Sequence, residues 1–150
     1  RRILGLNDRQ VAIVRDVDDA RRMRLGVVHR ADHDLRGIAH AVRVGELMFC
    51  AGQIPIEPAT GNLVTGDIKV QTERVLQNVK AILDDQGLTF ANVVKSTVFL
   101  TNLADFAGMN EVYAKYFTND FPARSTIQAA RLPRDARVEI DCVAAIEQIE

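Results

Sequence analysis

Apolar positions recur with a helical period in two stretches of the chain and alternate with polar positions in much of the rest. In residues 67–86 they return every three or four residues, and Gly87 follows where a left-handed helix cap is expected. A bulky stripe of the same period runs through 103–117, which Thr101 or Asn102 can cap. These patterns predict two amphipathic helices, each with an apolar face to bury.

The alternating segments predict strands, and glycine or proline marks the turns between them. Gly45 and Glu46 are expected to form a tight turn between the first two strands, and residues 132–136 to join the last two as a simple hairpin. From residue 41 onward the predicted order of elements is therefore ββαβαββ. The predicted strands are 42–44, 47–51, 92–100, 123–130 and 137–146.

Each predicted helix lies between strands in the chain, so both helices can cover one face of a single mixed sheet. The opposite face is then left open and needs another surface to bury it. In the last strand this second face is half apolar, which fits an oligomer in which the sheets of several subunits meet. The two faces of that strand are Val138, Ile140, Cys142, Ala144 and Ile146, and Arg137, Glu139, Asp141 and Val143.

Composition separates the first 40 residues from the remainder. They hold nine of the 15 arginines and all three histidines, but no lysine and none of the eight phenylalanines and tyrosines. Their net charge is +3, whereas residues 41–150 carry −4. Because aromatic side chains contribute most to core burial, we treat 1–40 as an Arg-rich leader attached to a domain at 41–150. The pattern from Asn7 to Leu25 allows an amphipathic helix, and 10–17 alternatively a strand.

Totals for the whole chain exclude several functional classes. With 47% hydrophobic and 26% charged residues, the protein is expected to fold around a core. No apolar run approaches the roughly 18 residues of a membrane span, no signal peptide opens the chain, and a net charge of −1 gives no reason to bind nucleic acid. Cys50 and Cys142 lack C-x-x-C spacing and are expected to be buried, reduced thiols. We therefore expect a cytoplasmic protein that binds neither membrane nor nucleic acid.

Histidines are the first candidates for metal or acid/base chemistry. His29, His33 and His40 lie near Asp32 and Asp34, but in the segment with the weakest structural pattern. Because a metal site needs fixed geometry as well as ligands, none is expected here. The chain also lacks a P-loop and a G-x-G-x-x-G motif.

Two charged residues in predicted strands allow both a structural and a functional interpretation. Arg124 begins a strand after a proline-fixed loop, where it either forms a surface ion pair or presents a two-pronged donor at a pocket mouth. Glu139 interrupts an apolar strand, where it either faces water or, if buried at an interface, holds a water or transfers a proton.

Short motifs in a fixed order through the second part of the chain carry a family resemblance. Near the C-terminus these are Pro-Ala-Arg-Ser at 122–125, Ala-Arg-Leu-Pro at 130–133 and Val-Glu-Ile at 138–140. Together with the earlier motifs they resemble the RidA/YjgF family of enamine and imine deaminases. The earlier motifs are Ala-Gly-Gln-Ile-Pro at 51–55, Gln-Asn-Val-Lys-Ala-Ile at 77–82, Val-Lys-Ser-Thr-Val-Phe at 94–99, and Asn110 before Tyr113.

The resemblance implies a homotrimer of ferredoxin-like or chorismate-mutase-like α+β subunits, with the sheets forming a central barrel and pockets between neighbours. It implies hydrolysis of 2-imino acids or their enamine tautomers, such as 2-aminoacrylate and 2-iminobutanoate, to 2-keto acids and ammonia, without metal or cofactor. Arg124 would bind the substrate carboxylate, and Glu139 would position or activate the attacking water. The other implied substrate-binding residues are Gly52, Gln53, Asn110, Ser125 and Thr126.

This chain departs from the family pattern at two positions. Thr126 stands where many members have a cysteine, which removes thiol reactivity but keeps the backbone contact. Ile38 stands where members usually have a pocket tyrosine, and it cannot form a phenol's hydrogen bond. Two alternatives therefore stay open beside the deaminase: RNA cleavage or translation inhibition, and a non-catalytic trimeric module that binds a small carboxylate.

The predicted hairpin also bears on how the pocket is built. It would place Arg124 opposite Ala144, so that Glu139 lies about five residues, or roughly 16 Å, along the strand. We therefore expect Arg124 and Glu139 of one pocket to come from different chains.

Overall fold

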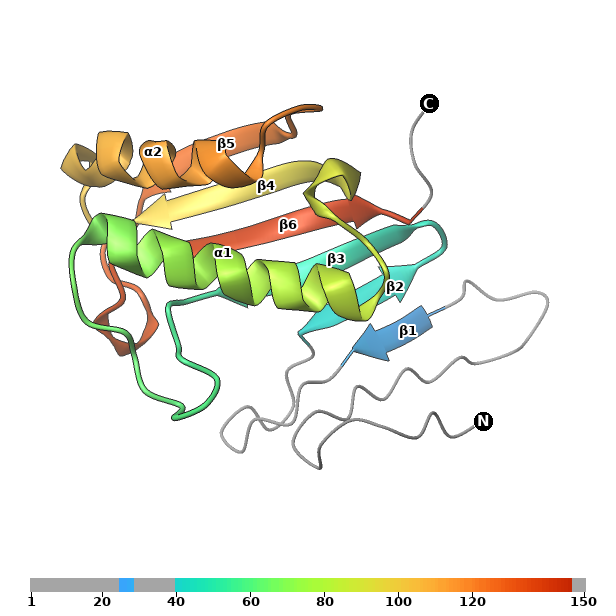
Figure 1. The fold of residues 1–150 in the computed structure, drawn as a ribbon, viewed down its shortest axis with the longest axis horizontal. Helices are drawn as coiled ribbons and strands as arrows, with labels where there is room; N and C mark the ends of the chain where they lie inside the picture. Colours follow the sequence, from blue (N-terminus) through green and yellow to red (C-terminus); the bar gives the residue numbers. More distant parts are fainter. Residues whose placement is uncertain (1–24, 29–39, 147–150) are drawn as a thin grey trace.

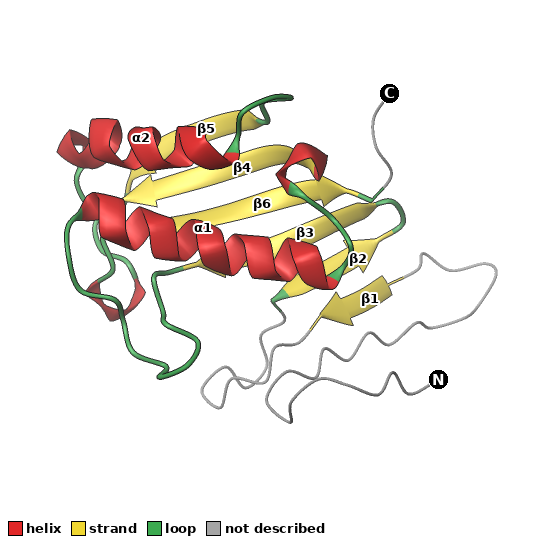
Figure 2. Ribbon diagram, in the orientation of Figure 1, coloured by secondary structure: helices red, strands yellow, loops and turns green. Residues whose placement is uncertain are grey.

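The computed structural model describes residues 25–28 and 40–146, in which two α-helices cover one face of a six-stranded mixed sheet (Figure 1, Figure 2). The strand order is β1-β2-β3-β6-β4-β5. The α+β class and the element order ββαβαββ from residue 41 are confirmed. The elements are β1 (Leu25–Val28), β2 (Ala41–Val44), β3 (Leu47–Gln53), α1 (Ile68–Asp85), β4 (Val93–Leu100), α2 (Phe106–Tyr116), β5 (Ala123–Gln128) and β6 (Val138–Ala145).

A side-chain cap precedes each α-helix: one caps α1 itself, and the other caps a short 3-10 helix that leads into α2. Asp67 accepts a hydrogen bond from Val70 N at 3.0 Å, and α1 begins directly after it. Before α2 the chain makes a short 3-10 helix, η2 (Leu103–Asp105), and the predicted cap Asn102 accepts from Ala104 N. The second α-helix is shorter than predicted because this 3-10 helix takes up its first turn.

The predicted hairpin between the last two strands is wrong. β5 pairs in parallel with one edge of β4, and β6 pairs antiparallel with the other edge, so β4 lies between them. Arg124 is therefore aligned with Ser96 of β4, and Ala144 of β6 pairs with Met48 and Val93. The simple hairpin would also have placed Arg131 opposite Arg137, but neither residue lies within a strand.

Backbone bonds at the end of β4 explain why the connection is a crossover and not a hairpin. Ala129 N donates to Leu100 O at 2.8 Å, and Thr101 N donates to Arg137 O at 3.1 Å. Both ends of the connection between β5 and β6 are thus bonded to the end of β4. Alternating polarity identifies a segment as a strand but does not identify its neighbours, which is why the prediction failed.

One part of the leader joins the sheet. Leu25–Val28 forms β1, which pairs antiparallel with β2 from Leu25 opposite Val44 to Val28 opposite Ala41. The helix predicted from Asn7 to Leu25 is therefore wrong at its C-terminal end, because the free edge of β2 offers backbone partners to an extended segment. The rest of that helix, and the alternative strand at 10–17, lie outside the described residues. The boundary between leader and domain stays a prediction.

The core fills the space between the helices and the sheet. Gly108 lets α2 approach α1 closely, since a Cβ at this position would lie 2.7 Å from Ile68 Cγ2. In β6 the predicted buried face is confirmed, with Val138 and Ala144 fully buried and Glu139 half-buried on the other face. The largest side chains with less than 2% exposure are Met48, Leu76, Ile82, Leu83, Leu100, Met109 and Ile140.

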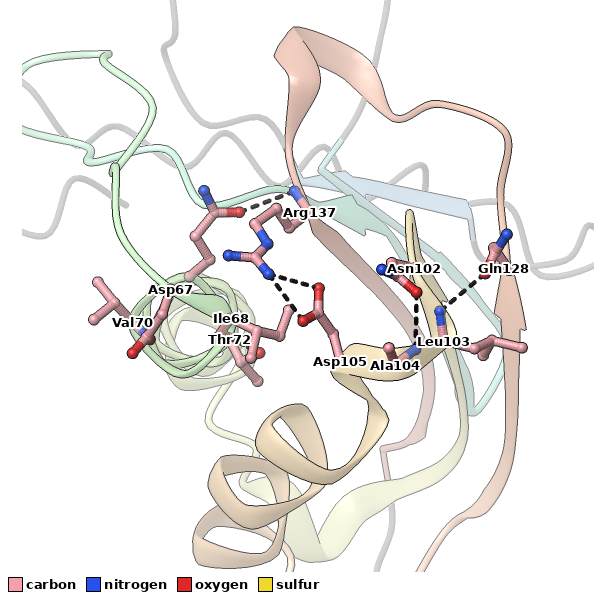
Figure 3. A network of polar contacts seen from close by, with 11 residues as sticks. Asp67, Ile68, Val70, Thr72, Asn102, Leu103, Ala104, Asp105, Gln128 and Arg137 are labelled. Carbon is pink, nitrogen blue, oxygen red and sulfur yellow. Dashed lines mark hydrogen bonds and ion pairs between the residues drawn. The ribbon is translucent and has the colours of Figure 1, made fainter.

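A polar network ties the start of β6 to both helices (Figure 3). Arg137 donates through Nη2 to both carboxylate oxygens of Asp105, at 2.8 and 3.0 Å, and its backbone N donates to Gln71 Oε1 of α1 at 2.9 Å. Nearby, Leu103 N donates to Gln128 Oε1 at 2.9 Å, which joins η2 to the end of β5. These bonds fix α2 over the edge of the sheet formed by β4 and β5.

The face of the sheet away from the helices mixes apolar and charged side chains. Phe49, Val143 and Lys95 lie in one row across β3, β6 and β4, and Phe99 lies between Glu139 and Ile127. Phe49 is 46% exposed and Ile127 47% exposed. Both α-helices lie on the other face, as the sequence predicts (Figure 2). We call this surface the open face.

Replacing Asn78 by alanine should lower the free energy of unfolding by about 2 kcal/mol, since two partly buried carbonyl oxygens would lose their donor. The Asn78 amide donates to Ile54 O at 3.2 Å and to Ile56 O at 2.9 Å, holding the loop that leaves β3. Urea denaturation measures the change. Gln77→Ala, one position along the same helix at an exposed residue, should change it by less than about 0.5 kcal/mol. Equal effects of the two substitutions would contradict this assignment.

Candidate functional site

Arg124 lies half-buried on β5 with its guanidinium against α2. Its Nη1 donates to Asn110 Oδ1 at 2.7 Å. The guanidinium carbon lies 4.6 Å from the centre of the Tyr113 ring and 5.5 Å from that of Phe106. The alternative interpretation as a surface ion pair finds no support within residues 25–28 and 40–146, where none of the ion pairs involves Arg124. The described residues instead orient this cation with an amide and an aromatic face.

Helical spacing explains why these three partners meet one arginine. Phe106, Asn110 and Tyr113 stand at steps of four and three along α2 and therefore share one face of the helix. That face lies over β5, where Arg124 points toward the helix side of the sheet. Tyr113 is buried, and its hydroxyl lies 2.7 Å from Ser96 Oγ on β4. Burial raises the pKa of Tyr113, so its ring carries a neutral phenol.

The two predicted substrate-binding residues after Arg124 face opposite ways. Ser125 accepts a hydrogen bond from Lys95 Nζ at 2.8 Å on the open face. Thr126 is half-buried and, by strand alternation, lies on the same face as Arg124. The structure therefore groups Arg124, Asn110 and Thr126 beneath the edge of α2 and leaves Ser125 apart from them.

Glu139 belongs to a second group, on β6 and the end of β3. A Cβ added to Gly52 would overlap Glu139 Oε1, so only glycine leaves room for the carboxylate in its present position. Gln53 follows directly, and its amide donates to Ala51 O at 3.1 Å. The pairing of β3 with β6 is irregular between Cys50 and Gln53, which is where the two strands admit this contact. Gly52, Gln53 and Glu139 are thus neighbours.

Partial burial raises the pKa of Glu139, and the nearby Asp141 carboxylate raises it further. Both groups project from the open face of β6, two residues apart. A carboxyl with a raised pKa is a stronger base once ionised, which suits it to accept a proton from water.

Within one chain, Glu139 and Arg124 lie far apart. Glu139 is aligned with Phe99 and Arg124 with Ser96, which places the two three residues apart along β4 and on strands either side of it. Their Cα separation is then about 14 Å, from the usual rise and strand spacing. Arg124 moreover points to the helix side and Glu139 to the open face. That the two residues of one pocket come from different chains stays a prediction. Its basis is now their opposite orientation on strands either side of β4, and no longer the hairpin.

Three residues of the Arg124 group were not identified from the sequence as site residues. Phe106 was assigned only to the bulky stripe of a helix. Tyr113 and Ser96 were included in the family motifs but were given no role in a site. One signal could have found them: Asn110 is a polar residue within an otherwise bulky stripe at helical spacing. Such an interruption indicates that the face meets a polar partner and not only a core.

Of the other candidates, His29, His33 and Ile38 lie outside the described residues, and His40 is buried. The described residues contain no group of three or more potential metal ligands of the His, Cys, Asp or Glu type. None of their helices is long and apolar enough to cross a bilayer. Cys50 and Cys142 are free, buried and paired in register, and a hydrogen bond from one to the other together with burial raises the pKa of Cys142.

Comparison with known proteins gives consistent matches. The family model described as Endoribonuclease L-PSP matches residues 35–146. Protein DfrA of Myxococcus xanthus is 48% identical over 128 residues, covering 83% of this chain and 98% of that protein. The chloroplastic Reactive Intermediate Deaminase A of Arabidopsis thaliana is 44% identical over 108 residues, 72% of this chain and 58% of that one.

A solved structure agrees in fold as well as in sequence. TdcF of E. coli, with bound serine, is 41% identical, with a TM-score of 0.69 over 72% of this chain and 87% of that one. The chain therefore belongs to the endoribonuclease L-PSP family, which is the RidA/YjgF family that its motifs resemble.

Proposed function

We propose that this protein is a hydrolytic deaminase of small 2-imino acids and their enamine tautomers, and that Arg124 binds the substrate carboxylate. The observation that carries the proposal is a half-buried guanidinium oriented by Asn110 and Tyr113. A relative named as a reactive intermediate deaminase and a relative with bound serine support it. Serine carries its carboxylate and its nitrogen on the same carbon, C2, as a 2-imino acid does.

The reaction needs few groups because a protonated imine is already a strong electrophile. Water adds to the C2 carbon of the iminium, and Glu139 accepts a proton from that water as the bond forms. Glu139 then returns this proton to the nitrogen. As the C–N bond breaks, the new hydroxyl group gives its own proton to Glu139, the C=O bond forms, and ammonia and a 2-keto acid are released. Arg124 would fix the orientation of the substrate through a bidentate pair with its carboxylate. Small substrates such as 2-aminoacrylate and 2-iminobutanoate fit this scheme.

The pocket is proposed to form between neighbouring chains of a homotrimer. Two observations support this: Arg124 and Glu139 face opposite sides of one sheet, and the open face exposes Phe49 and Ile127. A second copy placed against the open face would bury these side chains and could bring its own arginine to Glu139. Gly52 and Gln53 would then join Glu139 on one wall, with Asn110, Arg124 and Thr126 on the other.

RNA cleavage is the second candidate function, because the matching family model carries the description of an endoribonuclease. The charge of −4 over residues 41–150 does not favour a phosphate-binding surface there. The Arg-rich leader is the alternative source of such a surface. A chain without residues 1–36 that still cleaves RNA would exclude the leader as the cause.

Replacing Arg124 by alanine should lower kcat/KM for imine hydrolysis about 100-fold, because the carboxylate loses a charged bidentate partner. A dehydratase that releases 2-aminoacrylate supplies the substrate, and the rate of keto-acid release is measured. Arg43→Ala, a change of equal charge on β2, is the control and should retain full activity. An active Arg124→Ala variant would refute the proposed carboxylate site, and carboxylate binding without turnover by the wild type would favour the non-catalytic module.

Mixed oligomers test whether one pocket uses two chains. Arg124→Ala and Glu139→Gln should each be inactive alone. When equal amounts of the two exchange subunits at random, about one quarter of the pockets will combine an intact arginine with an intact glutamate from its neighbour. Activity should therefore recover to about one quarter of the wild-type value. No recovery, with exchange confirmed by mass spectrometry, would show that both residues act from the same chain.

The pH profile should report Glu139. As the Glu139 carboxylate takes up a proton, kcat/KM should fall with acidification, and the Asp141 carboxylate, which raises the pKa of Glu139, should keep the midpoint of this fall higher than it would be without that charge. Asp141→Asn removes a negative charge that raises this pKa and should therefore move the midpoint to lower pH. Titration of the substrate is common to both proteins and cancels in the comparison. An unmoved midpoint would mean that Glu139 is not the titrating group.

A further inference from the structure

The guanidinium of Arg124 lies over the aromatic ring of Tyr113. The guanidinium carbon lies 4.6 Å from the ring centre, within the range at which a cation is attracted by the negative face of an aromatic ring. Asn110 meets the same group at its edge, through Nη1. The two contacts together restrain the position of the guanidinium.

The Tyr113 ring is itself fixed on its other sides. Its hydroxyl lies 2.7 Å from Ser96 Oγ in the buried layer between α2 and the sheet. Phe117 stacks on the ring with centres 4.3 Å apart and planes inclined by 21°, and Phe90 packs edge-on against Phe117 at 4.9 Å. Because the ring is 6% exposed and contacted at its rim and face, it has little freedom to tilt.

Strand register connects this ring back to the arginine. Ser96 is the partner of Arg124 across the parallel pairing of β4 and β5. Arg124 is therefore linked to Tyr113 twice. Its backbone pairs with Ser96, which hydrogen-bonds the Tyr113 hydroxyl, and its guanidinium contacts the Tyr113 ring directly. These links fix the Arg124 side chain relative to its own strand, so the guanidinium is preorganised before a ligand binds.

We propose that Tyr113 is a positioning residue whose ring face, anchored by Ser96, sets the affinity of Arg124 for a carboxylate. The inference rests on the proposed function, because it concerns the same carboxylate site. The guanidinium carbon lies over the Tyr113 ring, and Asn110 occupies Nη1. A carboxylate must then approach in the guanidinium plane along the N–H groups that remain.

A graded series of side chains separates the ring's electrostatics from its shape. Phenylalanine and its 4-fluoro, 3,5-difluoro and 3,4,5-trifluoro derivatives at position 113 keep the ring but progressively weaken the negative charge of its face. Calorimetry with pyruvate as the probe should show Kd rising stepwise, by about tenfold in total. Melting temperatures should stay constant across the series. KM should follow Kd while kcat stays nearly constant, which a merely structural role would not produce.

Two controls distinguish failure of the proposed carboxylate site from failure of the proposed role of Tyr113. The same fluorinated series at Phe90, which contacts Phe117 and Tyr116, should leave Kd unchanged. If Arg124→Ala binds pyruvate as wild type does, or wild type does not bind it, the proposed carboxylate site fails and the role of Tyr113 fails with it. If Arg124→Ala loses binding while Kd is flat across the series at position 113, the role of Tyr113 alone is overturned.

Discussion

The position of β4 between β5 and β6 determines how the site residues are distributed. Because β4 pairs with both neighbours, Arg124 is held beside Ser96, while Glu139 is held beside Phe99. Side-chain alternation then sends the arginine to the helix side and the glutamate to the open face. A simple hairpin of β5 and β6 would have placed Arg124 beside Ala144 instead of Ser96. The connection that prevents it is bonded at both ends to the end of β4.

The sequence was informative wherever the evidence is local. Helix periods, the cap Asn102 and the alternation in β6 depend on neighbours within a few residues, and each is found in the structure. The pairing of β5 depends on a strand about 30 residues earlier, and no pattern within β5 contains that information. The same holds for the site. Arg124 could be selected from its motif, but its contact with Tyr113 depends on how α2 crosses the sheet.

The two groups of candidate residues differ in how their charges are accommodated. Arg124 keeps a delocalised charge in contact with an aromatic face and an amide, which suits a weakly hydrated cation. Glu139 is partly removed from water next to Asp141, so its charged form is disfavoured within the single chain. A partner that brings positive charge to the open face would relieve this cost. The electrostatics of one chain thus agree with the assembly proposed from its apolar side chains.

The contact between Gly52 and Glu139 also limits which substitutions this protein can accept during evolution. A side chain at position 52 would displace the carboxylate, while a shorter acid at position 139 would vacate the space that the glycine leaves. Substitutions at the two positions are therefore not independent, although 87 positions separate them in the chain.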